Sequence, residues 1–301
     1  MSSSLQEKVS IRDGSDEVCP KIIHRIYFTD YPPFNDKFEH YLQTWERELP
    51  EYKIMQWNAS NLDLEANEWV RRAVRARQPV FLSEYFRWKK LQEYGGLYLD
   101  ADCEVLSGPV LRRLMSELRE STQFDAFLGV EEFSNGFPTA QTVAAKKGSA
   151  LVDFMVQLYE TSLSGPLWHW REERSLIGPQ LISLYFRDQG RELYEGMFKY
   201  ITEPEVEARV KVYPQEWFSP KFGISGRALK YTENTCVYHL FGNANVSEMH
   251  YEGRLIRDKP LLFHEYVKFA GQRQPFGVKL RDFMSRLKRY ARRKLKGLLG
   301  R

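Results

Sequence analysis

The sequence predicts an α/β protein, a sheet with helices packed against it. Short β-rich runs alternate along the chain with segments of helical periodicity, which is the pattern of this class. The first run, Lys21 to Phe28, is apolar. Further on, Gly95-Gly96 stands directly before the apolar run Leu97 to Leu99, and two aspartates follow. Polar residues at the carboxyl end of a strand are typical of a ligand-binding edge.

The amino-terminal part contains two expected strands and three expected helices. Lys21 to Phe28 predicts a buried strand, and Tyr52 to Trp57 predicts a second one. Between them, apolar residues at helical spacing predict a helix from Phe38 to Leu49. Asn61 to Arg77 predicts a less regular helix. Val80 to Tyr94 predicts a longer one, because its apolar residues recur every three or four positions.

Later elements follow the same alternation. Gly95-Gly96 ends the preceding helix, since glycine adopts the left-handed conformation of a C-terminal cap. Leu97 to Leu99 then predicts a short strand. Further strands are expected at Phe124 to Val130, Val210 to Tyr213 and Cys236 to Phe241, and further helices at Ala150 to Leu163 and Ser175 to Asp188.

Length and composition predict one large globular domain with two appendages. The 301 residues are 43% hydrophobic, enough for a buried core. Residues 1–18 are expected to form a flexible arm, 19–275 the globular domain and 276–301 a separate helix. The three cysteines show no metal-ligand spacing, and such an odd, sparse set is typical of a reducing compartment. With no run of about 20 apolar residues and no apolar N-terminal leader, a cytoplasmic protein is expected.

The carboxyl-terminal segment predicts a basic amphipathic helix. Residues 279–301 carry ten Lys or Arg and one Asp, a net charge of +9, which leaves −5 for the rest of the chain. Apolar residues from Leu280 to Leu298 fall on one helical face. We expect it to dock on an anionic membrane surface, or else to pack on the body with a solvated basic face. Nucleic acid is disfavoured, because the body is acidic and contains no nucleic-acid-binding motif.

Asp100 and Asp102 predict a metal site. In an extended segment, residues two apart point the same way, so both carboxylates would lie on one side and Ala101 on the other. Carboxylate oxygens suit Mn²⁺ and Mg²⁺, and such a cation neutralises a departing diphosphate. Glu84 and Arg87, spaced i and i+3 on the preceding helix, are candidate partners of this site, although that spacing also occurs in local helix ion pairs.

The stretch from Phe81 to Glu104 resembles the DxD region of glycosyltransferase family 32, which includes capsular-polysaccharide and Och1-like transferases and has a core similar to that of clostridial glucosylating toxins. Pro20 to Phe28 is similar to the opening motif of that family. The resemblance covers roughly residues 20–245. Weaker matches are Trp45, Pro50, Tyr52 and Trp57, the stretch Gly178-Pro179-Gln180-Leu181, and Tyr238-His239.

The resemblance implies a GT-A-type nucleotide-binding sheet and retention of anomeric configuration. It implies that Asp102 binds the metal and that Asp100 contacts the ribose, the donor sugar or the metal. Arg87 and Glu84 would then hold the donor sugar or phosphate. The remaining implied contacts are nucleotide contacts by His24, Arg25, Ile26 and Tyr27, a donor contact by Gln180, and a metal or diphosphate contact by His239.

Two departures from the family pattern bear on the site. Ser83-Glu84 stands where the family usually has Ser-Asp, so the carboxylate reaches one methylene further. The usual Ser-Trp after the late histidine is absent, so the role of His239 stays open between a metal ligand and a core residue. Asn135 and Gln141 are candidates for the sugar pocket, since amides bind hydroxyls.

Together these patterns predict a metal-dependent retaining glycosyltransferase. It would move a hexose or N-acetylhexosamine from a nucleoside-diphosphate sugar, with UDP favoured by the resemblance, to a glycan or lipid-linked acceptor. A role in surface polysaccharide synthesis on the inner face of the cytoplasmic membrane is expected. Two alternatives stay open: a glycoside hydrolase that uses the carboxylates without nucleotide or metal, and a non-catalytic protein that binds membranes peripherally.

Overall fold

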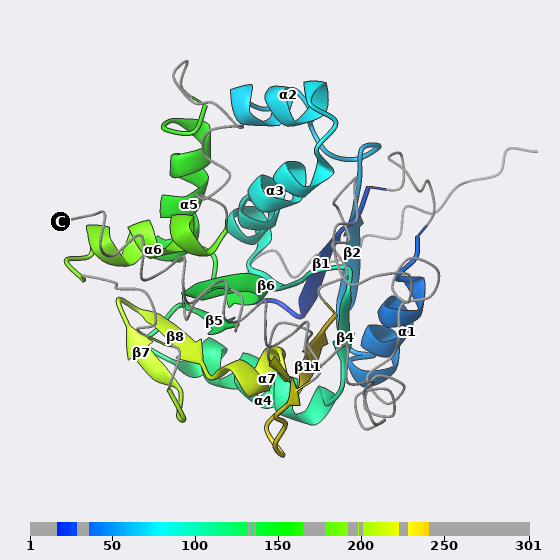
Figure 1. Ribbon diagram of the computed structural model, residues 1–301, viewed down its shortest axis with the longest axis vertical. Coiled ribbons are helices and arrows are strands. Elements are labelled where there is room, and N and C mark those ends of the chain that lie inside the picture. Colours follow the sequence, from blue (N-terminus) through cyan, green and yellow to red (C-terminus); the bar gives the residue numbers. More distant parts are fainter. Residues whose placement is uncertain are drawn as a thin grey trace, which may run out of the picture.

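The computed structural model describes residues 17–28, 36–131, 134, 137–164, 178–191, 198, 201–222 and 228–240. Its centre is a seven-stranded sheet flanked by helices (Figure 1). The strands are β1 (Ile22–Ile26), β2 (Lys53–Trp57), β3 (Gly96–Leu99), β4 (Cys103–Val105), β5 (Ala126–Val130), β6 (Pro138–Ala145), β7 (Glu205–Glu207), β8 (Val210–Tyr213), β9 (Lys221–Phe222), β10 (Ala228–Leu229) and β11 (Val237–His239). The helices are α1 (Glu39–Glu48), α2 (Glu68–Arg75), α3 (Pro79–Tyr94), α4 (Gly108–Glu120), α5 (Ala150–Glu160), α6 (Pro179–Asp188) and α7 (Gln215–Phe218).

The strand order in the central sheet is β2-β1-β3-β6-β5-β8-β7. Strands β2, β1 and β3 are parallel, and β6 runs antiparallel to both β3 and β5. Strands β3 and β5 therefore point the same way, and their carboxyl ends lie at one edge of the sheet. Two small antiparallel sheets accompany it, β10-β9 and β11-β4.

Helices cover both faces of the sheet, and the strands alternate between two hydrophobic clusters. One cluster joins the sheet to α2, α3, α5 and α6, and the other joins it to α1, α4 and α7. In β3, Tyr98 belongs to the first cluster, whereas Leu97 and Leu99 belong to the second. The alternation follows from the two-residue period of a strand. The predicted α/β class, with a sheet flanked by helices, is confirmed.

Most predicted elements are present within a few residues of their expected bounds. The helix expected over residues 61–77 is shorter, because residues 58–67 form turns and the side chain of Asn67 accepts a hydrogen bond from the backbone N–H of Val70 at the start of α2. Helix α4 and strand β6 were not predicted, and neither were the short elements β4, β7, α7, β9 and β10. The small and polar residues of β6, with sequence PTAQTVAA, give no strong apolar pattern, although all eight are buried.

Several predicted segments lie outside the described residues. They include residues 1–16 of the arm, Asn135, and the whole basic segment 276–301. The division into arm, domain and basic helix therefore stays a prediction. Within the part of the chain that the structure describes, no helix combines the length and the apolar character that crossing a bilayer requires.

Candidate metal and donor site

The two aspartates lie in a turn that follows β3. Gly95 and Gly96 place the chain there, because both have positive φ angles of 68° and 99°, which glycine adopts without strain. A Cβ atom on Gly96 would also come within 2.8 Å of the carbonyl oxygen of Ile22 on β1. Strand β3 then runs to Leu99, and the backbone N–H of Cys103 donates to the carbonyl of Asp100 at 2.9 Å.

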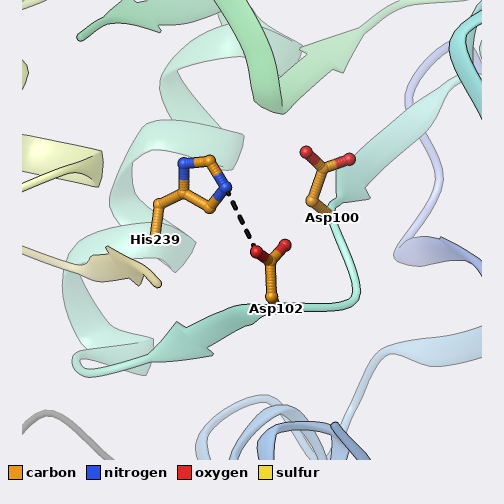
Figure 2. A group of neighbouring side chains, drawn as sticks. All are labelled: Asp100, Asp102 and His239. Carbon is orange, nitrogen blue, oxygen red and sulfur yellow. Dashed lines mark ion pairs between the residues drawn. The ribbon is translucent and has the colours of Figure 1, made fainter. Parts of the chain in front are cut away.

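This turn corrects the expected extended geometry of the motif. Residues 101 and 102 form the turn, so the two carboxylates do not share one side through strand alternation. They converge nevertheless, because the turn folds the backbone back before β4 begins at Cys103 (Figure 2). Asp102 is buried, whereas Asp100 is partly exposed.

The carboxylate of Asp100 is held by a residue of β3 and a residue of α3. The hydroxyl of Tyr98 donates to Oδ1 of Asp100 at 2.6 Å, and Nη2 of Arg87 lies 3.3 Å from the same oxygen. Arg87 also donates to the carbonyls of Ser83 and Ala140, and its guanidinium lies over the Tyr98 ring. These contacts make Arg87 a positioning residue for Asp100 in this structure. A donor contact by Arg87 stays a prediction.

His239 reaches the aspartates through strand pairing. Strand β11 pairs antiparallel with β4 so that His239 lies opposite Cys103, and the N–H of Leu240 donates to the carbonyl of Asp102 at 3.1 Å. Nε2 of His239 lies 3.6 Å from Oδ2 of Asp102 (Figure 2). One ligand atom each from Asp100, Asp102 and His239 lies within 4.8 Å of the others. The structure therefore brings together the three predicted metal ligands.

Glu131 is a member of this cluster that the sequence patterns did not identify. It directly follows β5, and its Oε1 lies 2.6 Å from Nδ1 of His239. Its position resembles that of Asp100, because both residues follow strands whose carboxyl ends lie at the same sheet edge. An acidic residue directly after the predicted strand Phe124 to Val130 is the pattern that points to it.

The electrostatics of the cluster favour a cation. Burial by itself lowers the pKa of His239, but the neighbouring carboxylates of Glu131 and Asp102 outweigh burial and raise it to about 10. A proton on the imidazole is thus stabilised by carboxylates that lie at the same position as the predicted metal site. A divalent cation bound by Asp100, Asp102 and His239 would neutralise the same negative charge.

Glu84 lies on α3 beside the start of α6. Burial and the charge of Asp100 raise its pKa to about 7, against the opposing effects of Arg87 and a hydrogen bond from the backbone N–H of Gly178. Its Oε2 atom is buried and has no hydrogen-bond partner among the described residues. The same holds for Oε1 of Gln180 and Nε2 of Gln141. Buried polar atoms of this kind are uncommon, and a bound polar ligand would satisfy them.

In the segment from His24 to Tyr27, His24 and Ile26 belong to the core. Nε2 of His24 donates to the carbonyl of Gly95 at 2.9 Å, and its Nδ1 accepts from Nε1 of Trp57 at 3.2 Å. Burial lowers the pKa of His24 to about 4, so this ring is a neutral core group that joins β1 to β2 and to the end of α3. Ile26 is fully buried in the core.

Arg25 and Tyr27 lie on the opposite side of this strand from His24. Arg25 forms an ion pair with Asp36 at 2.7 Å and donates to Gln56 at 3.1 Å. Burial and Asp36 raise the pKa of Tyr27 to about 12, and the charge of Asp102 adds to this effect. Tyr27 therefore lies within electrostatic range of the Asp102 carboxylate. Nucleotide binding by residues 24–27 stays a prediction.

Comparison with known proteins agrees with this reading of the site. Residues 35–124, which include α1, α3 and both aspartates, match the family described as "Glycosyltransferase sugar-binding region containing DXD motif". This match supports a glycosyltransferase whose DXD motif is Asp100-Ala101-Asp102. No curated protein matches the sequence.

Three solved structures resemble the fold distantly. The PaToxG glycosyltransferase has 13% identity and a TM-score of 0.41, over 57% of this chain and 70% of its own. A glycosyltransferase involved in glycosylation of the major capsid of PBCV-1 has 13% identity and a TM-score of 0.38, over 74% and 95%. Mouse xyloside xylosyltransferase 1 has 9% identity and a TM-score of 0.41, over 74% and 98%.

Proposed function

We propose that this protein is a metal-dependent, GT-A-type retaining glycosyltransferase. It transfers a hexose or N-acetylhexosamine from a nucleoside-diphosphate sugar, with UDP-sugars favoured, to a hydroxyl of a glycan or lipid-linked acceptor. The observation that carries the proposal is the convergence of Asp100, Asp102 and His239 within 4.8 Å, with both aspartates inside the segment that matches the DXD family.

The residues present fit a divalent cation. Asp100, Asp102 and His239 would hold it, and two carboxylates with one imidazole suit Mn²⁺, while the carboxylates alone suit Mg²⁺. Oδ1 of Asp100 is already fixed by Tyr98 and Arg87, so this ligand is preorganised. When bound, the cation supplies electrostatic stabilisation of a leaving diphosphate.

We assign the sugar end of the donor to Glu84, Gln141 and Gln180, each of which has a buried polar atom without a hydrogen-bond partner among the described residues. The Gln180 Oε1 atom is an acceptor, the Gln141 Nε2 atom is a donor, and the Glu84 carboxyl accepts when ionised and also donates when protonated, so the three match sugar hydroxyls. Glu84 lies close enough to Asp100 for their charges to interact, which connects this group of atoms to the metal cluster. We therefore assign the donor sugar to the space between α3 and the start of α6.

Retention of configuration fits transfer without a covalent intermediate. The acceptor oxygen attacks the anomeric carbon on the face from which the diphosphate departs, and the bond from that carbon to the phosphate oxygen breaks. The acceptor proton passes to the departing phosphate oxygen. Nearby carboxylates favour the positive charge that develops on the sugar ring.

We propose further that the reaction takes place at a membrane surface. The basic amphipathic pattern of residues 276–301 supports docking on the inner face of the cytoplasmic membrane, where a lipid-linked acceptor for surface polysaccharide synthesis would lie. Removal of this segment tests the idea. Liposome binding should fall while transfer to a soluble acceptor is kept, and retained liposome binding would contradict it.

Thermal shift measurements test the proposed function. A panel of nucleoside diphosphates and their sugars is added to the wild type and to Asp102→Ala, with and without Mn²⁺. Because a ligand that binds only the folded state raises the melting temperature, one nucleotide should give a Mn²⁺-dependent increase that Asp102→Ala lacks. The absence of any nucleotide-dependent increase would contradict the transferase and favour the hydrolase or the non-catalytic alternative.

A further inference from the structure

The contact between Glu131 and His239 determines which ring nitrogen faces the aspartates. Oε1 of Glu131 lies 2.6 Å from Nδ1 of His239, and an ionised carboxylate only accepts hydrogen bonds. Nδ1 therefore carries the hydrogen of this pair. The other ring nitrogen, Nε2, faces Asp102 with its nearer carboxylate oxygen 3.6 Å away. The ring is thus presented with Nε2 toward the place where a cation would bind.

Glu131 is held rigidly enough to orient its partner. It is 8% exposed and follows β5 directly. The pairing of β5 with β6 shifts register between Leu128 and Gly129, an irregularity of the kind that redirects side chains near active sites. Beyond it, Oγ of Ser134 donates to the carbonyl of Glu131 at 2.7 Å and accepts from its N–H at 3.3 Å.

We propose that Glu131 is a positioning residue that fixes the tautomer and orientation of His239 for metal binding, and thereby favours Mn²⁺ over Mg²⁺. A carboxylate on the outer nitrogen of a ligating histidine orients the ring and increases its strength as a ligand. Mg²⁺ prefers oxygen ligands and retains its waters, so it gains less from an oriented imidazole. The proposal rests on the metal site of the proposed function.

Calorimetric titration of the full chain with Mn²⁺ and with Mg²⁺ tests it. Glu131→Gln keeps the size of the side chain and removes its charge, and it should weaken Mn²⁺ binding about 10- to 100-fold. Mg²⁺ binding should weaken by a smaller factor. A role confined to folding would weaken Mn²⁺ binding and Mg²⁺ binding by the same factor. That result would overturn the proposal.

Asp125→Asn is the matched control. Asp125 lies just before β5, at the opposite end of the strand from Glu131, and it is also buried. Its partners are Arg209 at 2.8 Å and Ser149 at 2.9 Å, both outside the metal cluster. This substitution removes a buried charge of the same strand and should leave Mn²⁺ affinity at the wild-type value. An equal loss of affinity in Asp125→Asn and Glu131→Gln would overturn a specific role for Glu131.

The combination with His239→Ala shows whether Glu131 acts through the imidazole. In the absence of that ring, adding Glu131→Gln should change Mn²⁺ affinity less than twofold, and an undiminished loss would overturn the proposal. If Glu131→Gln does not fold, Glu131→Asp replaces it. Glu131→Asp should bind Mn²⁺ more weakly than the wild type but more tightly than is expected for Glu131→Gln. A wild-type Mn²⁺ affinity in Glu131→Asp would overturn the proposal. Wild-type Mn²⁺ binding that Asp102→Ala abolishes and Glu131→Gln leaves unchanged overturns the role of Glu131 alone. No Mn²⁺ binding by the wild type overturns the metal site itself and this proposal with it.

Discussion

Nη2 of Arg87 lies 3.3 Å from Oδ1 of Asp100, so helix α3 holds the first aspartate of the DXD motif in position. The side chain of Arg87 is 11% exposed and that of Asp100 is 22% exposed. Removing one partner of an ion pair this far from solvent destabilises the folded protein, because the remaining charge stays partly desolvated. The motif therefore depends on a residue of the preceding helix as well as on its own turn.

Replacement of Arg87 should destabilise the protein through the charge left on Asp100. Arg87→Met should lower the free energy of unfolding by about 2 kcal/mol or more, measured by urea denaturation without metal. Lys89→Met on the same helix is the control, since Lys89 pairs with Glu160 at the surface and should lose less than about 1 kcal/mol. Equal losses in the two variants would show that the Arg87 pair contributes no more than a surface pair.

Removal of the Tyr98 hydroxyl should weaken the anchoring of Asp100. Tyr98→Phe deletes the 2.6 Å hydrogen bond to a carboxylate and should cost about 1.5–3 kcal/mol of unfolding free energy. Tyr85→Phe is a matched control on α3, because its hydroxyl donates at 2.8 Å to Glu160, whose side chain is 39% exposed. The same denaturation measurement should give a smaller loss there, and a larger loss in Tyr85→Phe would contradict the anchoring role.

The pH dependence of stability should report the burial of Glu84. Burial raises the pKa of Glu84 from 4.5 to about 7, so the folded protein retains a proton that the unfolded chain releases. The stabilising contribution of Glu84 is therefore complete below about pH 4.5 and is lost as the pH rises to about 7. Relative to Glu84→Gln, metal-free wild type should lose about 3 kcal/mol across this window and change little above it.

Denaturant unfolding of both proteins between pH 4 and 8, with a chelator present, measures this difference. Subtracting the Glu84→Gln values removes contributions that all other titrating groups share. If the wild type keeps a constant stability relative to Glu84→Gln, or gains stability relative to it as the pH rises, then Glu84 is ionised in the folded protein.

Metal removal should abolish sugar transfer reversibly. A chelator should eliminate transfer by the wild type, and excess Mn²⁺ should restore it, because the proposed reaction needs a cation at Asp100, Asp102 and His239. Asp102→Asn should keep kcat/KM at least about 100-fold below the wild-type value even with excess Mn²⁺. Asp63→Asn, at an exposed aspartate outside the site, should behave like the wild type. Sugar release that persists in the chelator and needs no nucleotide would identify a hydrolase instead.

The sequence by itself determined the elements around the DXD motif, because their causes are local. The apolar periodicity of α3, the paired glycines and the short run Leu97 to Leu99 all act over a few residues. They place Asp100 and Asp102 at the carboxyl end of a strand. The turn at the motif was not predicted, since the extended and turned forms of three residues differ by hydrogen bonds such as that between Cys103 and Asp100.

The family resemblance gave His239 as a candidate ligand, but only the tertiary structure decided that it meets the two aspartates, and only the tertiary structure added Glu131. His239 is placed by the pairing of β11 with β4, and Glu131 by the shared direction of β5 and β3. His239 and Glu131 are 108 positions apart and still lie 2.6 Å from each other. No local propensity encodes such a contact, because it depends on strand pairing across the whole domain. The sequence thus specifies the carboxylate pair, and the folded sheet supplies the imidazole and carboxylate that complete the candidate site.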